Sequence, residues 1–104
     1  MASIGYAEVR AALAAARRRR RLSQGAVNAA RTEIEVRWSE IDVQHVDEML
    51  VRNAGDVAET YALRPLDATH LAAALALTDE ELVFATWDDR LRAAARKAGL
   101  AVAR

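Results

Sequence analysis

The stretch LDATHLAAALALTDEELVFATWD, residues 66–88, decides the fold of this chain. Pro65 precedes it and suits a first helical turn, where its missing N–H is not needed, so a helix is predicted from Pro65 to about Leu77. The run Leu82–Ala85 is continuously apolar, as in a parallel strand that is covered on both faces. One carboxylate, Asp67, stands at the beginning of the helix, and another, Asp88, follows the strand. The stretch therefore predicts one helix and one strand of an α/β fold, each with an acid at one end.

On either side of this stretch, helical segments alternate with short apolar ones. Ser3 and Ser23 are predicted to cap the first two helices, because a serine hydroxyl accepts hydrogen bonds from free N–H groups. Asp88 or Asp89 is predicted to cap the last helix, and Gly99 suits the left-handed position after its end. The predicted helices cover about 3–20, 23–37, 46–61 and 88–97, and the predicted strands cover 41–43 and 100–102. This alternation predicts a parallel sheet flanked by helices.

Composition places the chain among single-domain globular proteins. Its 104 residues suffice for one core, so residues 1–104 are expected to form one domain. Basic and acidic residues balance at 15 each, so the net charge gives no argument for nucleic acid. Cysteine is absent, which excludes disulfides and thiolate metal sites. No apolar run approaches the length of a membrane span, about 18 residues, so a cytoplasmic protein is expected.

Two acids occupy positions that suit a metal site, although each has a simpler alternative role. Asp67 begins a largely apolar helix face, but the helix dipole alone favours a carboxylate in a first turn. Asp88 follows a strand at its carboxyl end, where ligands bind in open α/β sheets, but aspartate is also a common helix cap. Glu8, early in the first helix, is by itself an ordinary helix acid. The face that begins at Asp67 continues through Leu71, Ala74, Leu75 and Thr78.

A run of five arginines, Arg17–Arg21, ends the first predicted helix. Such a run can lie along an RNA backbone. The alternative is a solvated helix end, where the dipole favours cations. No aromatic residue interleaves with the run, so it does not predict a base-stacking surface. The candidates for RNA contacts are Arg17, Arg18, Arg20 and Arg21.

The histidines and tryptophans of the chain carry weaker signals. His70 follows Asp67 by three residues and could neighbour the acids, but a packed or surface histidine is the simpler interpretation. His45 and His70 are not spaced as zinc ligands. Trp38 and Trp87 are predicted to be core or interface anchors, because indole rings bring a large apolar area to a contact.

Three segments, in order, resemble the PIN-domain family, and within it the VapC-type ribonuclease toxins of bacterial toxin–antitoxin pairs. They are SIGYAEV at 3–9, DATHLA at 67–72 and TWD at 86–88. Each motif alone is weakly specific. Together they place three acids in the family's order, 59 and then 21 positions apart, and nearly the whole chain aligns with the family pattern.

The resemblance implies an RNA-cleaving hydrolase whose clustered carboxylates bind Mg²⁺ or Mn²⁺. Glu8, Asp67 and Asp88 fall on the family's acidic positions, and Thr86 falls on its hydroxyl position near the metal. Carboxylate oxygens are suitable ligands for such hard cations, and the bound metal can activate a water and stabilise a leaving oxygen. The implied partners are an RNA substrate and a cognate antitoxin.

The chain departs from the family pattern at its beginning. The family opens with a central strand that carries its first aspartate, whereas Met1 stands just before the segment that contains Glu8. We therefore expect a PIN-like, three-layer fold that is truncated at its N-terminus and that forms a homodimer or a strand-exchanged oligomer. Two functions stay open: a metal-dependent endoribonuclease, or a catalytically inactive PIN-like fragment that serves as an interaction or dimerisation module.

Overall fold

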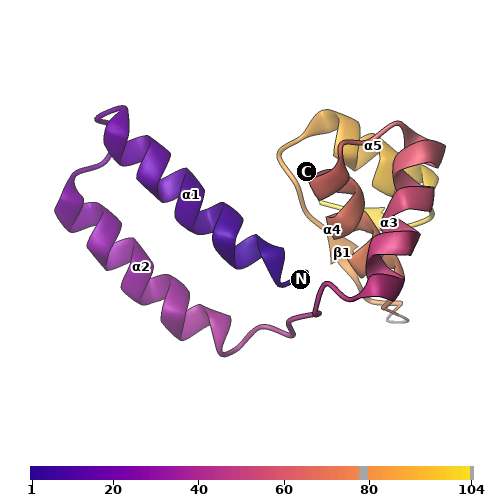
Figure 1. Ribbon diagram of the computed structural model, residues 1–104, viewed down its shortest axis with the longest axis horizontal. Helices are drawn as coiled ribbons and strands as arrows, with labels where there is room; N and C mark the ends of the chain where they lie inside the picture. Colours follow the sequence, from indigo (N-terminus) through magenta and orange to yellow (C-terminus); the bar gives the residue numbers. More distant parts are fainter. Residues whose placement is uncertain (78–79, 104) are drawn as a thin grey trace. The chain divides into compact units, whose positions relative to one another are not determined.

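The structure is a computed structural model, and it describes residues 1–77 and 80–103, so Thr78 lies outside the described residues. The chain divides into two compact units (Figure 1). The N-terminal unit contains Met1 and residues 3–44, and the C-terminal unit contains Ala2 and the chain from His45 onward. Within the described residues, the elements follow in the order α1, α2, α3, α4, β1, α5, β2.

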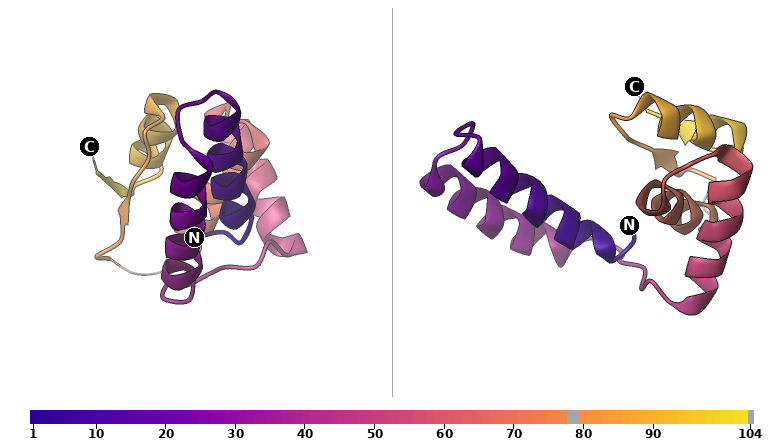
Figure 2. Two further views of the ribbon diagram at one scale, coloured as in Figure 1. Left: turned by 90° about the vertical axis from the view of Figure 1, so that its left-hand side faces the viewer. Right: turned by 45° about the horizontal axis from the view of Figure 1, so that its top comes forward.

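The N-terminal unit is a helical hairpin in which α1 (Ile4–Arg18) and α2 (Gln24–Trp38) lie side by side (Figures 1 and 2). The predicted cap of α2 is confirmed, because the Ser23 hydroxyl accepts a hydrogen bond from the Ala26 N–H at 3.1 Å. The predicted cap of α1 is wrong. Ser3 has helical backbone angles and its side chain makes no cap, while its own N–H donates to the Gln44 carbonyl at 2.8 Å.

Aromatic and polar contacts join the two helices of the hairpin. The rings of Tyr6 and Trp38 meet edge to face with their centroids 5.4 Å apart. The Tyr6 hydroxyl also donates to the Glu35 carboxylate, and Arg10 donates to the same hydroxyl at 2.9 Å. Val9, an apolar residue of α1, is exposed. The hairpin is therefore held by half-buried and exposed contacts.

The strand predicted at residues 41–43 does not form. A strand needs a hydrogen-bonded neighbour, and the backbone pairing occurs one position later. The Gln44 N–H donates to the Met1 carbonyl at 2.8 Å, and the Gln44 carbonyl accepts from Ser3. Alternating apolar residues alone were therefore a poor guide to this segment.

The C-terminal unit consists of α3 (Glu48–Tyr61), α4 (Pro65–Leu75), β1 (Val83–Phe84), α5 (Asp89–Lys97) and β2 (Ala101–Val102). The strands pair in parallel, with Val83 opposite Ala101 and Phe84 opposite Val102. Pro65 is the first residue of α4, as predicted, and Gly99 takes the predicted left-handed conformation after α5, with φ of 96°. The predicted α/β fold with a short parallel sheet is confirmed.

Small side chains build the core of this unit. Helices α3 and α4 pack against each other, and α4 also contacts α5 (Figure 2). Leu71 is completely buried. The close packing depends on alanine, which lets helix backbones approach. The buried hydrophobic residues of the C-terminal unit from His45 onward are Leu50, Ala54, Leu63, Ala68, Leu71, Ala72, Ala73, Leu91, Ala94 and Ala95.

The short sheet is more open than the sequence predicted. The segment Leu82–Ala85 was expected to be covered on both faces, but the Val83 side chain is 56% exposed. Val83 and its partner on the neighbouring strand, Ala101, are both exposed, so the face of the sheet that carries them has little cover. A continuous apolar run therefore did not distinguish full from partial burial. Among the described residues, no helix has the length and apolar character needed to cross a membrane.

Candidate functional site

Asp67 is held in the first turn of α4 by the local sequence around Pro65. Proline begins the helix, and Arg64 before it has an extended backbone. A carboxylate at this position is favoured by the partial positive charge of the helix N-terminus. The Asp67 side chain is 24% exposed, so it is partly shielded from solvent.

Asp88 lies where β1 leads into α5, and it caps that helix. Its Oδ1 accepts a hydrogen bond from the Leu91 N–H at 3.0 Å. This bond, followed by smaller effects that include the charge of Arg64, lowers the pKa of Asp88 below its ordinary value of 3.8, against an opposing effect of burial. The carboxylate is therefore ionised at neutral pH. Because the cap uses Oδ1, the second oxygen, Oδ2, can serve another cation, and the two roles considered for Asp88 are compatible.

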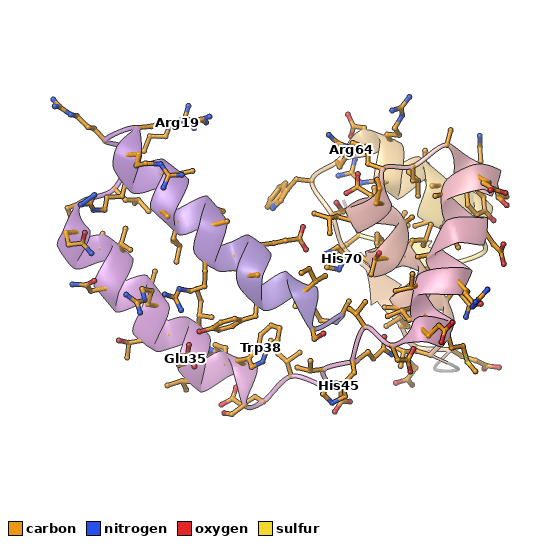
Figure 3. All side chains as sticks on the ribbon, viewed as in Figure 1. Arg19, Glu35, Trp38, His45, Arg64 and His70 are labelled. Atoms are coloured by element: carbon orange, nitrogen blue, oxygen red, sulfur yellow. The ribbon has the colours of Figure 1, made fainter. Side chains whose placement is uncertain are left out.

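Arg64 brings the two carboxylates to one cationic group. Its Nε lies 3.2 Å from Asp67 Oδ2, and its Nη2 lies 3.4 Å from Asp88 Oδ2. Arg64 stands at the beginning of α4 and is 74% exposed (Figure 3). Two acids that are 21 positions apart in the sequence thus contact the same guanidinium, and their role as metal ligands stays a prediction. Arg64 itself is the part of this arrangement that the sequence reasoning missed, although its place directly before Pro65 was a usable signal.

Thr86 supports the backbone that carries Asp88. Its hydroxyl accepts from the Asp88 N–H at 3.2 Å, and its carbonyl accepts from Arg92 at 2.8 Å. Arg92 also contacts Asp89 at 2.6 Å. These bonds fix the turn between β1 and α5, and with it the direction of the Asp88 side chain.

The two tryptophans have different surroundings. Trp38 packs against Tyr6, whereas Trp87 is 96% exposed. The expectation that Trp87 anchors the core is wrong, because the residue is almost fully exposed. A role for Trp87 in an interface stays a prediction.

The other candidate residues lie elsewhere in the fold. Glu8 lies in the first half of α1, in the N-terminal unit. His70 is in α4 (Figure 3). Both residues take part in interactions. Within the described part of each unit, no three acidic or histidine side chains gather closely enough to hold a metal ion. The structure therefore brings Asp67 and Asp88 together inside one unit, while Glu8 belongs to the other.

The arginine run divides at the end of α1. Arg17 and Arg18 form the last turn of the helix, and Arg20 has a left-handed backbone with φ of 58°. Arg17 donates to the Gln24 side chain, which joins the two ends of the hairpin turn. Arg17 and Arg18 also line a hollow of about 340 Å³ along the hairpin. Its other basic residues, Arg10 and Arg31, are distant from the run in sequence, so the sequence reasoning did not select them.

The chain is similar to known proteins over most of its length. The PIN domain family model matches residues 1–97. Ribonuclease VapC45 and Ribonuclease VapC49, from the CDC 1551 and H37Rv strains of Mycobacterium tuberculosis, are each 42% identical to the chain over 100 residues. Each alignment covers 96% of this chain and 69% of the relative. No solved structure gives a significant match. The chain therefore belongs to the PIN-domain family, among its VapC-type members.

Proposed function

We propose that the protein is a metal-dependent endoribonuclease toxin of a toxin–antitoxin pair. Asp67, Asp88 and Glu8 hold Mg²⁺ or Mn²⁺, and Thr86 orients Asp88. The hydrolysis of RNA phosphodiester bonds is proposed by extension from the named activity of the two mycobacterial relatives. We also propose that the protein binds a cognate antitoxin, lies in the cytoplasm and forms a dimer or a strand-exchanged oligomer.

One observation carries the proposal. Asp67 and Asp88 direct one oxygen each to the same guanidinium, so a single cation can contact both carboxylates. A divalent ion of the Mg²⁺ type is commonly held by one or two carboxylates, with waters and substrate phosphates as its other ligands. The residues of the C-terminal unit fit that requirement, and Glu8 would supply a third carboxylate.

The chemistry of these residues fits phosphodiester hydrolysis. A bound Mg²⁺ or Mn²⁺ supplies an activated water and stabilises charge on the leaving oxygen. Asp88 is suited to hold the ion because its carboxylate stays ionised, and its direction is fixed by the Leu91 and Thr86 hydrogen bonds. The basic hollow of the hairpin, lined by Arg10, Arg17, Arg18 and Arg31, suits contacts with the RNA backbone.

Cleavage of RNA by an Asp67→Asn variant tests the proposal. We expect the loss of metal-dependent cleavage, at least about 100-fold in rate, since the change removes a carboxylate that holds the metal. An Asp56→Asn variant is the control, because it makes the same change on an exposed part of α3. Cleavage by the Asp67→Asn variant at the parent's rate in Mg²⁺ or Mn²⁺ would show that the assignment is wrong.

A second function, an inactive PIN-like interaction module, is favoured by one observation. Neither unit gathers three potential metal ligands among its described residues. Such a module would bind no Mn²⁺ in a manner that depends on Asp67 and Asp88. Calorimetric titration with MnCl₂ of the parent chain and the Asp67→Asn variant therefore separates the two functions.

A further inference from the structure

Arg64 occupies the position at which a metal ion would meet the acidic pair. Its Nε and Nη2 contact Asp67 Oδ2 and Asp88 Oδ2, and the remaining carboxylate oxygen of Asp88, Oδ1, is engaged by the Leu91 N–H. A divalent ion that binds both carboxylates through these two Oδ2 atoms would compete with Arg64 for them. The two cations are therefore competitors for this pair.

We propose that Arg64 is an exchangeable counter-cation that holds Asp67 and Asp88 together and must be displaced before Mg²⁺ or Mn²⁺ can bind. The inference rests on the proposed metal-dependent function. Arg64 is then a positioning residue for the two acids. It also raises the concentration of divalent ion at which the site fills.

The geometry around Arg64 suits exchange. Its contacts of 3.2 and 3.4 Å are longer than the strongest charge-assisted hydrogen bonds, and its side chain is 74% exposed. Exposed ion pairs of this kind are weak and easily screened. Arg64 also precedes Pro65, outside the helix, so its side chain can swing away without any change in α4. By contrast, the Asp88 side chain is held by the Leu91 N–H, and Asp67 stands in the first turn of α4, so the main chain that carries both acids does not depend on Arg64.

Charge explains why the pair needs a counter-cation. Two carboxylates that approach the same point repel each other, and repulsion would turn Asp67 or Asp88 toward solvent. One guanidinium offers several donors in a rigid plane and can contact both acids at once. A lysine ammonium is a compact point charge on a flexible stem, so it would keep the charge and lose the planar two-acid geometry.

Mn²⁺ titration calorimetry on the full chain tests the proposal. In the Arg64→Gln variant, we expect Mn²⁺ affinity to rise about 2- to 10-fold, because no guanidinium has to be displaced from two weak pairs. Arg64→Lys should give a smaller rise. The matched control is Arg52→Gln, which removes a similarly exposed arginine paired with Glu48 on α3 and should leave Mn²⁺ affinity unchanged.

Thermal unfolding supplies a second measurement that does not depend on activity. Arg64→Gln should lower the Tm relative to the parent in EDTA, and the difference should disappear in saturating Mn²⁺, because the ion stabilises the variant more. For Arg52→Gln, the difference from the parent should be the same in both conditions.

The outcomes separate this inference from the proposed function. If the parent binds Mn²⁺ and Asp67→Asn does not, the metal site stands. An unchanged or weakened Mn²⁺ affinity in Arg64→Gln would then overturn the counter-cation role alone. If the parent shows no binding that depends on Asp67, the proposed metal-dependent function fails, and this inference fails with it.

Discussion

The two units of the protein are stabilised in different ways. Among the described residues of the helical hairpin, Val27 is the only buried hydrophobic side chain, and Tyr6 contacts the half-buried Trp38 and the exposed Glu35. The C-terminal unit buries a continuous set of leucine and alanine side chains around Leu71. The unit that has its own core is therefore also the unit that carries Asp67 and Asp88. Rigid support for Asp67 and Asp88 follows from the packing of α4 and α5.

The largest effect on stability is expected when a buried side chain is removed from the core of the C-terminal unit. Leu71→Ala should lower the free energy of unfolding by about 3 kcal/mol, because it leaves a cavity at a completely buried position. The control is Leu75→Ala, on the same helix at an exposed position, which should cost less than about 1 kcal/mol. Urea unfolding followed by circular dichroism measures both. Equal losses in the two variants would contradict the assignment of the core to the buried face of α4.

A smaller effect should distinguish the two tryptophans, one from each unit. Trp38→Ala should cost about 2 kcal/mol, since it removes a partly buried ring and its edge-to-face contact with Tyr6. Trp87→Ala should change the free energy of unfolding by no more than about 0.5 kcal/mol, because the side chain is almost fully exposed. The same unfolding experiment tests both variants. A loss of stability for Trp87→Ala well above the expected value would show that this ring is covered in solution.

The smallest effect concerns the caps of α2 and α5, one neutral and one charged. Ser23→Ala should cost about 1 kcal/mol at any pH between 3 and 7, because a hydroxyl does not titrate there. The pKa of Asp88 is lowered by folding, so its charge stabilises the protein above the ordinary value of 3.8 and this contribution is lost as pH falls through the folded-state pKa.

Asp88→Asn isolates the charge, since asparagine can still cap a helix. The parent should be the more stable protein at pH 7, and the difference should vanish at acidic pH below the pKa of Asp88. The urea concentration at the midpoint of unfolding, measured for both proteins across this pH range, gives the difference in stability. A difference between parent and Asp88→Asn that persists undiminished at the lowest pH would contradict an ionised cap.

Several features could be read from individual residues because their causes are local. Pro65 begins α4, Ser23 and Asp88 cap their helices, and Gly99 takes a positive φ, each for reasons that act within a few residues. The features that failed depend on distant partners. Ser3 engages Gln44 in place of its own helix, and Val83 lacks a cover on one side.

The acidic site likewise has some features that the sequence predicted and others that depend on the fold. The order of Glu8, Asp67, Thr86 and Asp88 is a property of the sequence, and it was enough to indicate the family and the type of metal ligand. Which oxygens face the same point, and that Arg64 contacts both acids, depended on how α4 and α5 pack. The sequence alone determined the helices, the Ser23 and Asp88 caps and the chemical character of the acids, because these follow from neighbours along the chain. Only the tertiary structure decided that Arg64 contacts Asp88 as well as Asp67, because that contact joins residues 24 positions apart.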